Sequence, residues 1–438
     1  MLLAKIAIYF LSLLTNCITC ENDSAERGKN YTIYQIIAFT AAERNILQYM
    51  QQTLKHTSFL NGITNEAALP IYVAVDNCCL KIFTDTLSKY AIFYAKISDY
   101  RYEPRHDMKH NQTRYLYTWN HISSWIKKIL RKYPKSIKES IIGRTFENKD
   151  LTLLKVSTGR RKPVIFIVGG EDGRDWTSAA IILQFIKNIL ENNLEELRNF
   201  YDFFFIPIFN PDGYSFSSSK ERFWAKNRKQ FYSKKLCPDN TLALGVNIDR
   251  NWFEESQGFE KGECSNFYPG EHPLSEEETM ALASLIDRIA PRTIAFFNLR
   301  AFDQLITIPY AQSGKLSMNH NTLVEIFNFA CEHLAEEYNM TYFLGSASKF
   351  FYNFSGNCAD WVKKNLNVPV VATIYMRHEH SIIADEEDIT PLYEQFETLM
   401  VDVLDLAKDL YGPLFNMQRR HSISITTYCI LITIHVIF

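Results

Sequence analysis

Residues 163–176 read PVIFIVGGEDGRDW, and this stretch decides the fold. Its first half is an apolar run of strand length that ends in two glycines, which is typical of a buried strand. The residues just past such a strand are a common place for an active site. Two acids, Asp172 and Asp175, lie there three positions apart with Arg174 between them. The stretch therefore raises the question of whether this is a metal site or the remains of one.

Strand-like and helix-like patterns alternate on both sides of this stretch, from Tyr115 to about Gly412. Residues 118–133 and 323–338 have the apolar spacing of amphipathic helices, and residues 201–209 read as a buried strand. Such alternation predicts an α/β domain with a mixed or parallel sheet that is covered on both faces.

A second, smaller unit is predicted at residues 31–98. Three strand-like runs and two helix-like runs alternate there, which indicates a small α/β open sandwich. Residues 99–114 follow as a polar, basic linker with Pro104 and the cations Arg105, Lys109 and Arg114. Its composition suits cleavage by a trypsin-like protease. The alternative is a solvated stretch that is not cut.

Composition excludes several classes of protein. The chain has 438 residues, of which 47% are hydrophobic and 14% aromatic, so a globular protein is expected. The formal net charge of −2 gives no electrostatic case for binding nucleic acid or an acidic membrane.

The two ends of the chain have their own patterns. Residues 1–20 resemble a secretory signal peptide, with a membrane anchor as the alternative. Residues 413–438 form an apolar tail similar to a glycolipid-anchor signal, with a disordered or packed extension as the alternative. Five Asn-X-Ser/Thr sequons agree with a secreted glycoprotein, and they begin at Asn22, Asn30, Asn111, Asn339 and Asn353.

Seven cysteines lie outside the signal, and an oxidising compartment would favour disulfides among them. Cys78 and Cys79 are adjacent and cannot easily pair with each other, so they are either buried or bonded to another chain. Cys331 could pair with Cys358, and the state of Cys429 stays open.

Six blocks in the larger unit occur in the order found in the A/B-type zinc metallocarboxypeptidases. They are FIVGGEDGRDW, NPDGYSFSSSKERFW, GVNIDRNW, ECSNFYPGEHPLSEEET, DQLITIPY and SGNCADW. The resemblance covers residues 115–412, and residues 31–98 are similar to the activation propeptide of that family. It implies a central mixed sheet of eight strands flanked by helices, preceded by the open sandwich. It also implies a disulfide between Cys237 and Cys264.

The resemblance places the three zinc ligands of the family at Asp172, Asp175 and Arg300. A catalytic zinc needs three protein ligands and an open position. Arginine has only donors and stays charged, so it cannot coordinate a metal, and its charge would repel one. We therefore expect no zinc cofactor. The three side chains could instead form an ion cluster with the guanidinium between two carboxylates, or point apart into solvent. A calcium or magnesium site of the two aspartates and water is disfavoured by Arg300.

Two further catalytic positions are also changed. The general base of the family corresponds to Tyr375, and a phenol with an ordinary pKa near ~10 is a poor base at neutral pH. The oxyanion arginine corresponds to Ala225. A carboxypeptidase-like chain without these parts is expected to be a pseudoenzyme.

Positions that hold substrate in the family are better preserved. Arg250 matches the clamp for a terminal carboxylate, although its neighbour Asp249 would repel that group. The others are the subsite arginines Arg174 and Arg222, the capping Tyr352, and Ala359, which would leave a roomy apolar pocket. These residues either still recognise a peptide C-terminus or persist as hydrogen-bonding supports of the fold.

The leading hypothesis is a secreted metallocarboxypeptidase-family protein that is catalytically inactive and binds a peptide or protein C-terminus or another protein partner. One alternative is an active zinc metallocarboxypeptidase with altered ligands, which releases C-terminal amino acids. Another is an interaction protein attached to the cell surface through the tail.

Overall fold

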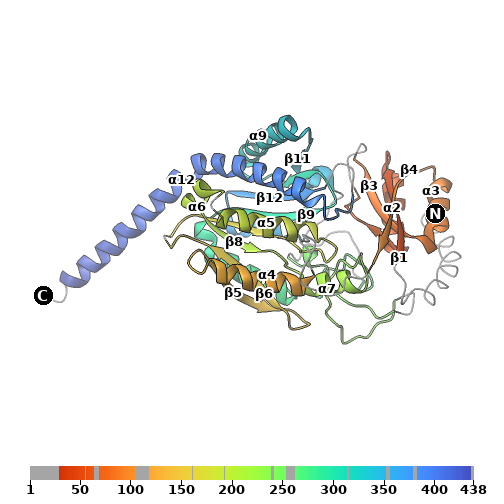
Figure 1. The fold of residues 1–438 in the computed structure, drawn as a ribbon, viewed down its shortest axis with the longest axis horizontal. Helices are drawn as coiled ribbons and strands as arrows, with labels where there is room; N and C mark the ends of the chain where they lie inside the picture. The colour runs from red at the N-terminus through yellow and green to blue at the C-terminus, as the bar shows by residue number, and fades with distance from the viewer. Residues whose placement is uncertain are drawn as a thin grey trace.

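The computed structural model describes residues 29–54, 56–63, 69–103, 118–159, 161–191, 193–237, 241–252, 262–312, 315–351, 356–377 and 382–435. The predicted signal peptide, most of the predicted linker and Tyr352 lie outside these residues, as do the sequons at Asn22, Asn111 and Asn353. Two sheets organise the described chain, one of four strands and one of eight (Figure 1).

The smaller sheet forms the N-terminal unit, drawn in red and orange in Figure 1. Its strand order is β2-β3-β1-β4 with all pairs antiparallel. The first helix begins with a capping box, in which the side chains of Thr40 and Glu43 satisfy each other's backbone N–H groups. The elements are β1 (Lys29–Ile37), α2 (Ala41–Thr53), β2 (Thr57–Phe59), β3 (Ile71–Asp76), η2 (Asn77–Cys79), α3 (Leu80–Lys89) and β4 (Phe93–Tyr102). The predicted open sandwich is confirmed.

The larger sheet has the order β11-β10-β12-β9-β7-β8-β6-β5. β8, β7, β9 and β12 run parallel to one another, and antiparallel pairs lie at both sides of them. This is the mixed eight-stranded sheet that the resemblance implies. Its strands are β5 (Ile137–Arg144), β6 (Asp150–Val156), β7 (Val164–Val168), β8 (Asp202–Ile206), β9 (Thr293–Ala301), β10 (Leu305–Ile308), β11 (Phe343–Ser346) and β12 (Val370–Met376).

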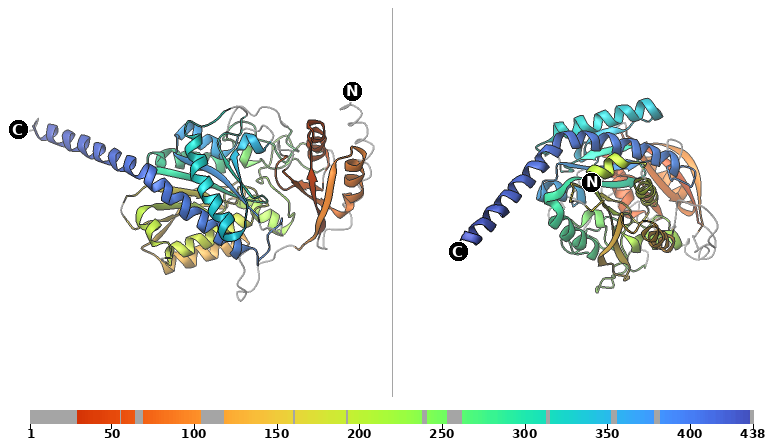
Figure 2. Two further views of the ribbon diagram at one scale, coloured as in Figure 1. Left: turned by 90° about the horizontal axis from the view of Figure 1, so that it is seen from above. Right: turned by 60° about the vertical axis from the view of Figure 1, so that its left-hand side comes forward.

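Helices cover both faces of this sheet, because its central strands are apolar on both sides. Phe203 and Phe205 of β8 pack in the core cluster that contains α4, α5, α9 and α12 side chains. Phe204, between them, packs in the cluster with α8 and α11. Figure 2 shows these layers from two further directions. The helices are α4 (Trp119–Lys132), α5 (Thr177–Leu190), α6 (Glu195–Phe200), α7 (Pro211–Ser219), η3 (Ile248–Arg250), α8 (Glu277–Ile289), η4 (Ala290–Arg292), α9 (His320–Tyr338), α10 (Ala347–Phe350), α11 (Cys358–Leu366) and α12 (Ile389–His435).

The last helix is much longer than the others and carries the predicted tail. α12 runs without a break from Ile389 to His435 and contains Pro413. Its C-terminal part projects away from the body of the molecule (Figures 1 and 2). Among the described residues, none of the helices is both long and apolar enough to span a bilayer. The attachment of the tail to a membrane stays a prediction.

The N-terminal unit is docked against the larger domain at the carboxyl end of the central strands. Tyr31 meets Phe223 edge to face with 4.7 Å between ring centroids. Leu69 is part of a buried cluster with Leu305, Phe350 and Phe351. These apolar contacts bring the small sheet over the turn that follows β7.

Candidate functional site

The turn after β7 is shaped by glycine. Gly170 has φ of +58°, and a Cβ atom on it would lie 3.0 Å from Cα of Ile208 and 3.2 Å from the carbonyl oxygen of Pro207. Its N–H donates to Oγ of Ser178 at 2.9 Å, which ties the turn to the start of α5. The chain therefore turns sharply at the sheet edge and delivers three acids, Glu171, Asp172 and Asp175, into the space above the strands.

Arg300 enters the same space from the neighbouring strand. β9 runs parallel to β7 with Val168 opposite Asn298, so both strands end at the same edge. Nη1 of Arg300 lies 3.0 Å from Oε2 of Glu171, which also accepts a hydrogen bond from Nδ2 of Asn298 at 2.6 Å. The Glu171 side chain is only 1% exposed. A half-buried guanidinium and a buried carboxylate thus face each other at the centre of the site.

Asp249 supplies a second carboxylate to the same guanidinium. Its Oδ2 is 3.1 Å from Nη1 of Arg300, and it also pairs with Nη1 of Arg250. Asp249 and Arg250 both belong to η3, and the backbone oxygen of Asp249 accepts a further hydrogen bond from the Arg250 side chain at 2.9 Å. Asp249 therefore bridges Arg250 and Arg300, and Arg250 is turned toward this bridge.

Asp172 is held mainly by Arg174. The Arg174 side chain makes a two-pronged contact, with Nη2 at 2.6 Å from Oδ2 and Nε at 2.9 Å from Oδ1, and its backbone N–H donates to Oδ1 at 2.9 Å. Nη2 of Arg300 is more distant, at 3.8 Å from Oδ2 of Asp172. The network contains three carboxylates (Glu171, Asp172, Asp249) and three guanidiniums (Arg174, Arg250, Arg300), so its formal charges cancel.

Asp175 takes a different part from the one expected. One of the arrangements considered placed the Arg300 guanidinium between Asp172 and Asp175, but the close carboxylates of Arg300 are Glu171 and Asp249. Oδ1 of Asp175 accepts the backbone N–H of Ser178 at 3.0 Å, in the first turn of α5. The correction has a local cause, since a carboxylate at a helix N-terminus satisfies an amide that lacks a partner within the helix.

Burial and the neighbouring charges set the protonation of these groups. Burial raises the pKa of Glu171 to about 7 and that of Asp175 to about 6. Burial also opposes the charged form of Asp172, but Arg174 and Arg300 outweigh it and hold the pKa of Asp172 below its usual range. Burial likewise disfavours the cation of Arg300, yet Asp249, Glu171 and Asp172 raise its pKa well above the ordinary value. Arg300 is thus a permanent cation.

The positions of the general base and of the oxyanion cation carry no substitute charge. Tyr375, on β12, lies opposite Arg300 in the parallel register and packs against Phe351, with 5.6 Å between ring centroids. Burial raises the pKa of its phenol. Ala225 is buried, and its carbonyl oxygen accepts the N–H of Gly173 at 3.0 Å. This backbone hydrogen bond joins the segment after α7 to the turn after β7.

The predicted substrate-side residues are distributed around the network. Arg222 is 2% exposed and stacks on the Trp176 ring, with its guanidinium carbon 3.7 Å from the ring centroid. Its Nη1 donates to the backbone oxygen of Arg174 at 2.7 Å. Ala359 is buried at the start of α11 next to Cys358, in the core cluster below the sheet.

The N-terminal unit contributes atoms to the site, which the sequence did not indicate. Nη1 of Arg174 donates to Oγ of Ser58 at 3.0 Å and to the backbone oxygen of Phe59 at 2.8 Å. Nε of Arg222 donates to the Tyr100 hydroxyl at 3.2 Å. Sequence reasoning also missed Glu171 and Asn298, although Glu171 stands in the stretch that was singled out. Its position directly before Asp172, at a strand end, was the available signal.

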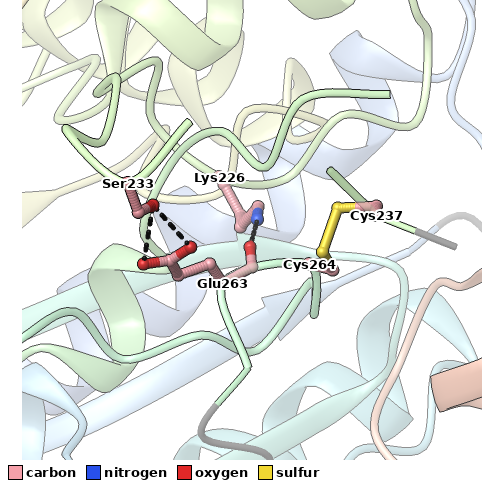
Figure 3. Close-up of a disulfide and its surroundings, with 5 residues drawn as sticks. All are labelled: Lys226, Ser233, Cys237, Glu263 and Cys264. Carbon is pink, nitrogen blue, oxygen red and sulfur yellow. Dashed lines mark hydrogen bonds between the residues drawn. A yellow bond between two sulfur atoms is a disulfide. The ribbon is translucent and has the colours of Figure 1, made fainter. Parts of the chain in front are cut away.

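The disulfide implied by the resemblance is present. Cys237 and Cys264 are joined, and Figure 3 shows the bond with its surroundings. Beside it, Nζ of Lys226 donates to the backbone oxygen of Glu263 at 2.9 Å, and the Glu263 carboxylate accepts from Oγ of Ser233 at 3.1 Å. The loops that follow α7 and η3 are thereby fastened to each other. Cys78, Cys79, Cys331 and Cys358 are not in disulfides.

The donor set does not fit a catalytic zinc ion. Of the three positions at which the resemblance places ligands, Arg300 is a guanidinium and Asp172 is bound by Arg174 on both oxygens. Asp175 accepts the backbone N–H of Ser178. A divalent cation there would be repelled by Arg300, which the surrounding acids keep charged. The site can hold strand ends together by ion pairing.

Known proteins match most of the chain. The family described as "Zinc carboxypeptidase" matches residues 122–398. Zinc carboxypeptidase A 1 of Anopheles gambiae is 24% identical over 415 residues, which is 90% of this chain and 94% of that protein. Mast cell carboxypeptidase A of Mus musculus is 28% identical over 369 residues, with 76% and 85% coverage.

Solved structures agree in fold. The crystal structure of thrombin activatable fibrinolysis inhibitor superposes with a TM-score of 0.76 at 22% identity, and covers 87% of this chain and 100% of that chain. Carboxypeptidase A from Helicoverpa armigera gives a TM-score of 0.73 at 17% identity, with 87% and 98% coverage. At these identities the likeness establishes the architecture alone, and the chemistry must be argued from the residues in the site.

Proposed function

This chain belongs to the zinc carboxypeptidase family, and from that premise we propose that it is a member without peptidase activity that serves as a binding protein. The observation that carries the proposal is the place of Arg300. Its guanidinium, at the position to which the resemblance assigns the third zinc ligand, is paired with Glu171 and Asp249.

Metal-assisted peptide hydrolysis makes three chemical demands that the residues at these positions do not meet. This mismatch supports the proposal. The reaction needs a metal with an open position, a base to take the proton of the attacking water, and a cation for the oxyanion. Arg300 repels a metal, the raised pKa of Tyr375 keeps its phenol protonated at neutral pH, and Ala225 has no charge.

The binding role rests on Arg250. Its side chain is 20% exposed, and a guanidinium is the side chain best suited to a terminal carboxylate. In this conformation Asp249 already pairs with it, so a peptide C-terminus would have to displace that carboxylate. The proposed ligand is therefore a peptide or protein C-terminus that competes with Asp249 and binds weakly to the native chain.

Peptide binding can be tested by fluorescence anisotropy with peptides that differ only at the C-terminus, free or amidated. We expect Asp249→Asn to tighten binding of the free form only, and Arg250→Met to abolish it. Arg288→Met, which removes an exposed arginine of α8, is the matched control. Equal affinity for both peptides, or no effect of Arg250→Met, would remove the C-terminus role.

Catalysis is tested separately with the full chain, before and after trypsin treatment, on peptides that end in apolar, basic or acidic residues. The mouse mast cell relative serves as the positive control, with zinc added to both proteins. We expect no release of C-terminal amino acids. Turnover that is lost on chelation and in Asp172→Asn would overturn the proposal and establish an active enzyme with altered ligands.

The proposed location is outside the cell, supported by the signal-like N-terminus and by two sequons on the surface. Asn30 and Asn339 are both exposed, at the start of β1 and at the C-cap of α9. Expression in a secretory cell line should yield protein in the medium whose mass falls on treatment with an N-glycosidase. Retention on the cell surface with release by a phospholipase would instead favour attachment through the tail.

A further inference from the structure

A second cluster of chemically active side chains lies in the N-terminal unit. Candidate ligand atoms of His56, Asp76 and Cys78 all lie within 4.8 Å of one another. His56 and Asp76 are half-buried, and Cys78 is exposed. None of these residues belongs to the ion network around Arg300.

The backbone brings these three residues together. β2 and β3 pair antiparallel with Thr57 opposite Val75, so His56 and Asp76 are the next pair along the ladder. The N–H of Asp76 donates to the backbone oxygen of His56 at 2.8 Å. His56 has φ of +61°, which changes the direction of the chain just before β2 begins.

Asp76 also orients the cysteine. Its Oδ1 accepts the backbone N–H of Cys78 at 3.1 Å, because Asp76 caps the short helix η2 that follows β3. The Cys79 sulfur lies 3.7 Å from the Cys78 sulfur, on the buried side. The backbone pairing of β2 with β3 and the hydrogen bond from the Cys78 N–H to the Asp76 side chain thus set the arrangement of the ligand atoms.

The chemistry of the set selects a class of metal. Thiolate, imidazole and carboxylate are the ligands that zinc takes in proteins, with bonds of roughly 2.0–2.3 Å. Such bonds place ligand atoms about 3.3–3.8 Å apart in a tetrahedron, which small side-chain rotations reach from the observed spacing. Calcium and magnesium prefer oxygen ligands only, so a soft sulfur disfavours them.

We propose that His56, Asp76 and Cys78 form a binding site for a divalent transition metal of the zinc type, with solvent in the remaining position. The site is independent of the lost catalytic centre. The site lies at the start of β2, whereas Ser58 and Phe59, which hold Arg174, lie further along that strand. A bound ion would join the start of β2 to η2.

Cobalt(II) titration of the full-length protein with the Cys237–Cys264 disulfide intact tests the site. We expect one cobalt per chain, with a thiolate-to-cobalt charge-transfer band in the near ultraviolet that zinc abolishes by displacement. Cys78→Ser should remove this band. His56→Asn and Asp76→Asn, which keep the left-handed backbone and the cap, should weaken binding by at least about tenfold, since each removes one of three protein ligands.

Two control variants separate this site from other histidines and from the catalytic position. His333→Gln removes an exposed histidine that contacts Glu337 and Asp402, and Asp172→Asn alters the network after β7. Both should leave the cobalt spectrum unchanged. A spectrum that lacks the thiolate band or persists in Cys78→Ser would overturn the proposal. So would metal that is lost in Asp172→Asn, or a disulfide at Cys78 in the freshly isolated protein.

Discussion

Nη1 of Arg300 lies 3.0 Å from Oε2 of Glu171, although 129 positions separate the two residues in the chain. The parallel pairing of β7 and β9 brings them to one edge of the sheet. The ion pair lies where the resemblance to the family leads us to expect a metal. Like a metal with ligands from both strands, it joins the ends of β7 and β9.

Removing Arg300 should cost more than removing the whole pair. In Arg300→Met, the buried carboxylate of Glu171 and the half-buried carboxylate of Asp249 would be left without that cation, and we expect a loss of about 3–5 kcal/mol in the free energy of unfolding. Adding Glu171→Gln should recover part of it, because the amide oxygen can still accept from Asn298. Urea unfolding of both variants and of Glu171→Gln gives the coupling energy. Additive effects would show that the pair is not coupled.

Arg174 should control the docking of the N-terminal unit. Arg174→Gln shortens the side chain that reaches Ser58 and the Phe59 carbonyl, so amide hydrogen exchange at residues 57–59 should become faster. Arg101→Gln, an exposed change in the same unit, should have no such effect. Unchanged exchange in Arg174→Gln would mean that the apolar contacts alone hold the unit in place.

The buried carboxyl group of Glu278 should lower the free energy of unfolding as the pH rises. Burial raises its pKa from 4.5 to about 8, so between these values the folded chain retains a proton that the unfolded chain has released. Glu278→Gln cannot ionise. Its free energy of unfolding should match that of the native protein near pH 4 and exceed it by on the order of 4–5 kcal/mol near pH 8.5.

Urea unfolding at several pH values checks this expectation, with the exposed neighbour change Glu277→Gln as the control. Other buried acids, such as Glu171 and Asp175, are common to both proteins and cancel in the difference. A stability difference that stays flat with pH would contradict the assignment.

The disulfide should be a substantial part of the stability of the loop region. Cys237 and Cys264 are 27 positions apart, and closing a loop of that length is worth about 3 kcal/mol in the chain-entropy account. The double change to serine should lower the free energy of unfolding by roughly that amount, whereas Cys331→Ser, which breaks no disulfide, should change it much less. Equal losses in the two variants would point to packing rather than to the cross-link.

Much of the architecture could be predicted from local patterns. The apolar run at residues 164–168 became β7, and the amphipathic run at residues 118–133 became α4 (Trp119–Lys132). β2 was missed, since a three-residue strand leaves almost no periodic pattern. Residues 413–435 were predicted as a separate tail, but they continue α12.

The sequence by itself determined the chemical character of the site. An arginine at position 300 has only hydrogen-bond donors and a fixed charge, whatever surrounds it, so its unfitness as a metal ligand follows from its identity. Only the tertiary structure decided its partners, Glu171 and Asp249 rather than Asp175, and the contacts of Arg174 with Ser58 and Phe59. Partner choice depends on distances between segments far apart in the chain, and those distances are set by sheet register and domain packing rather than by local propensity.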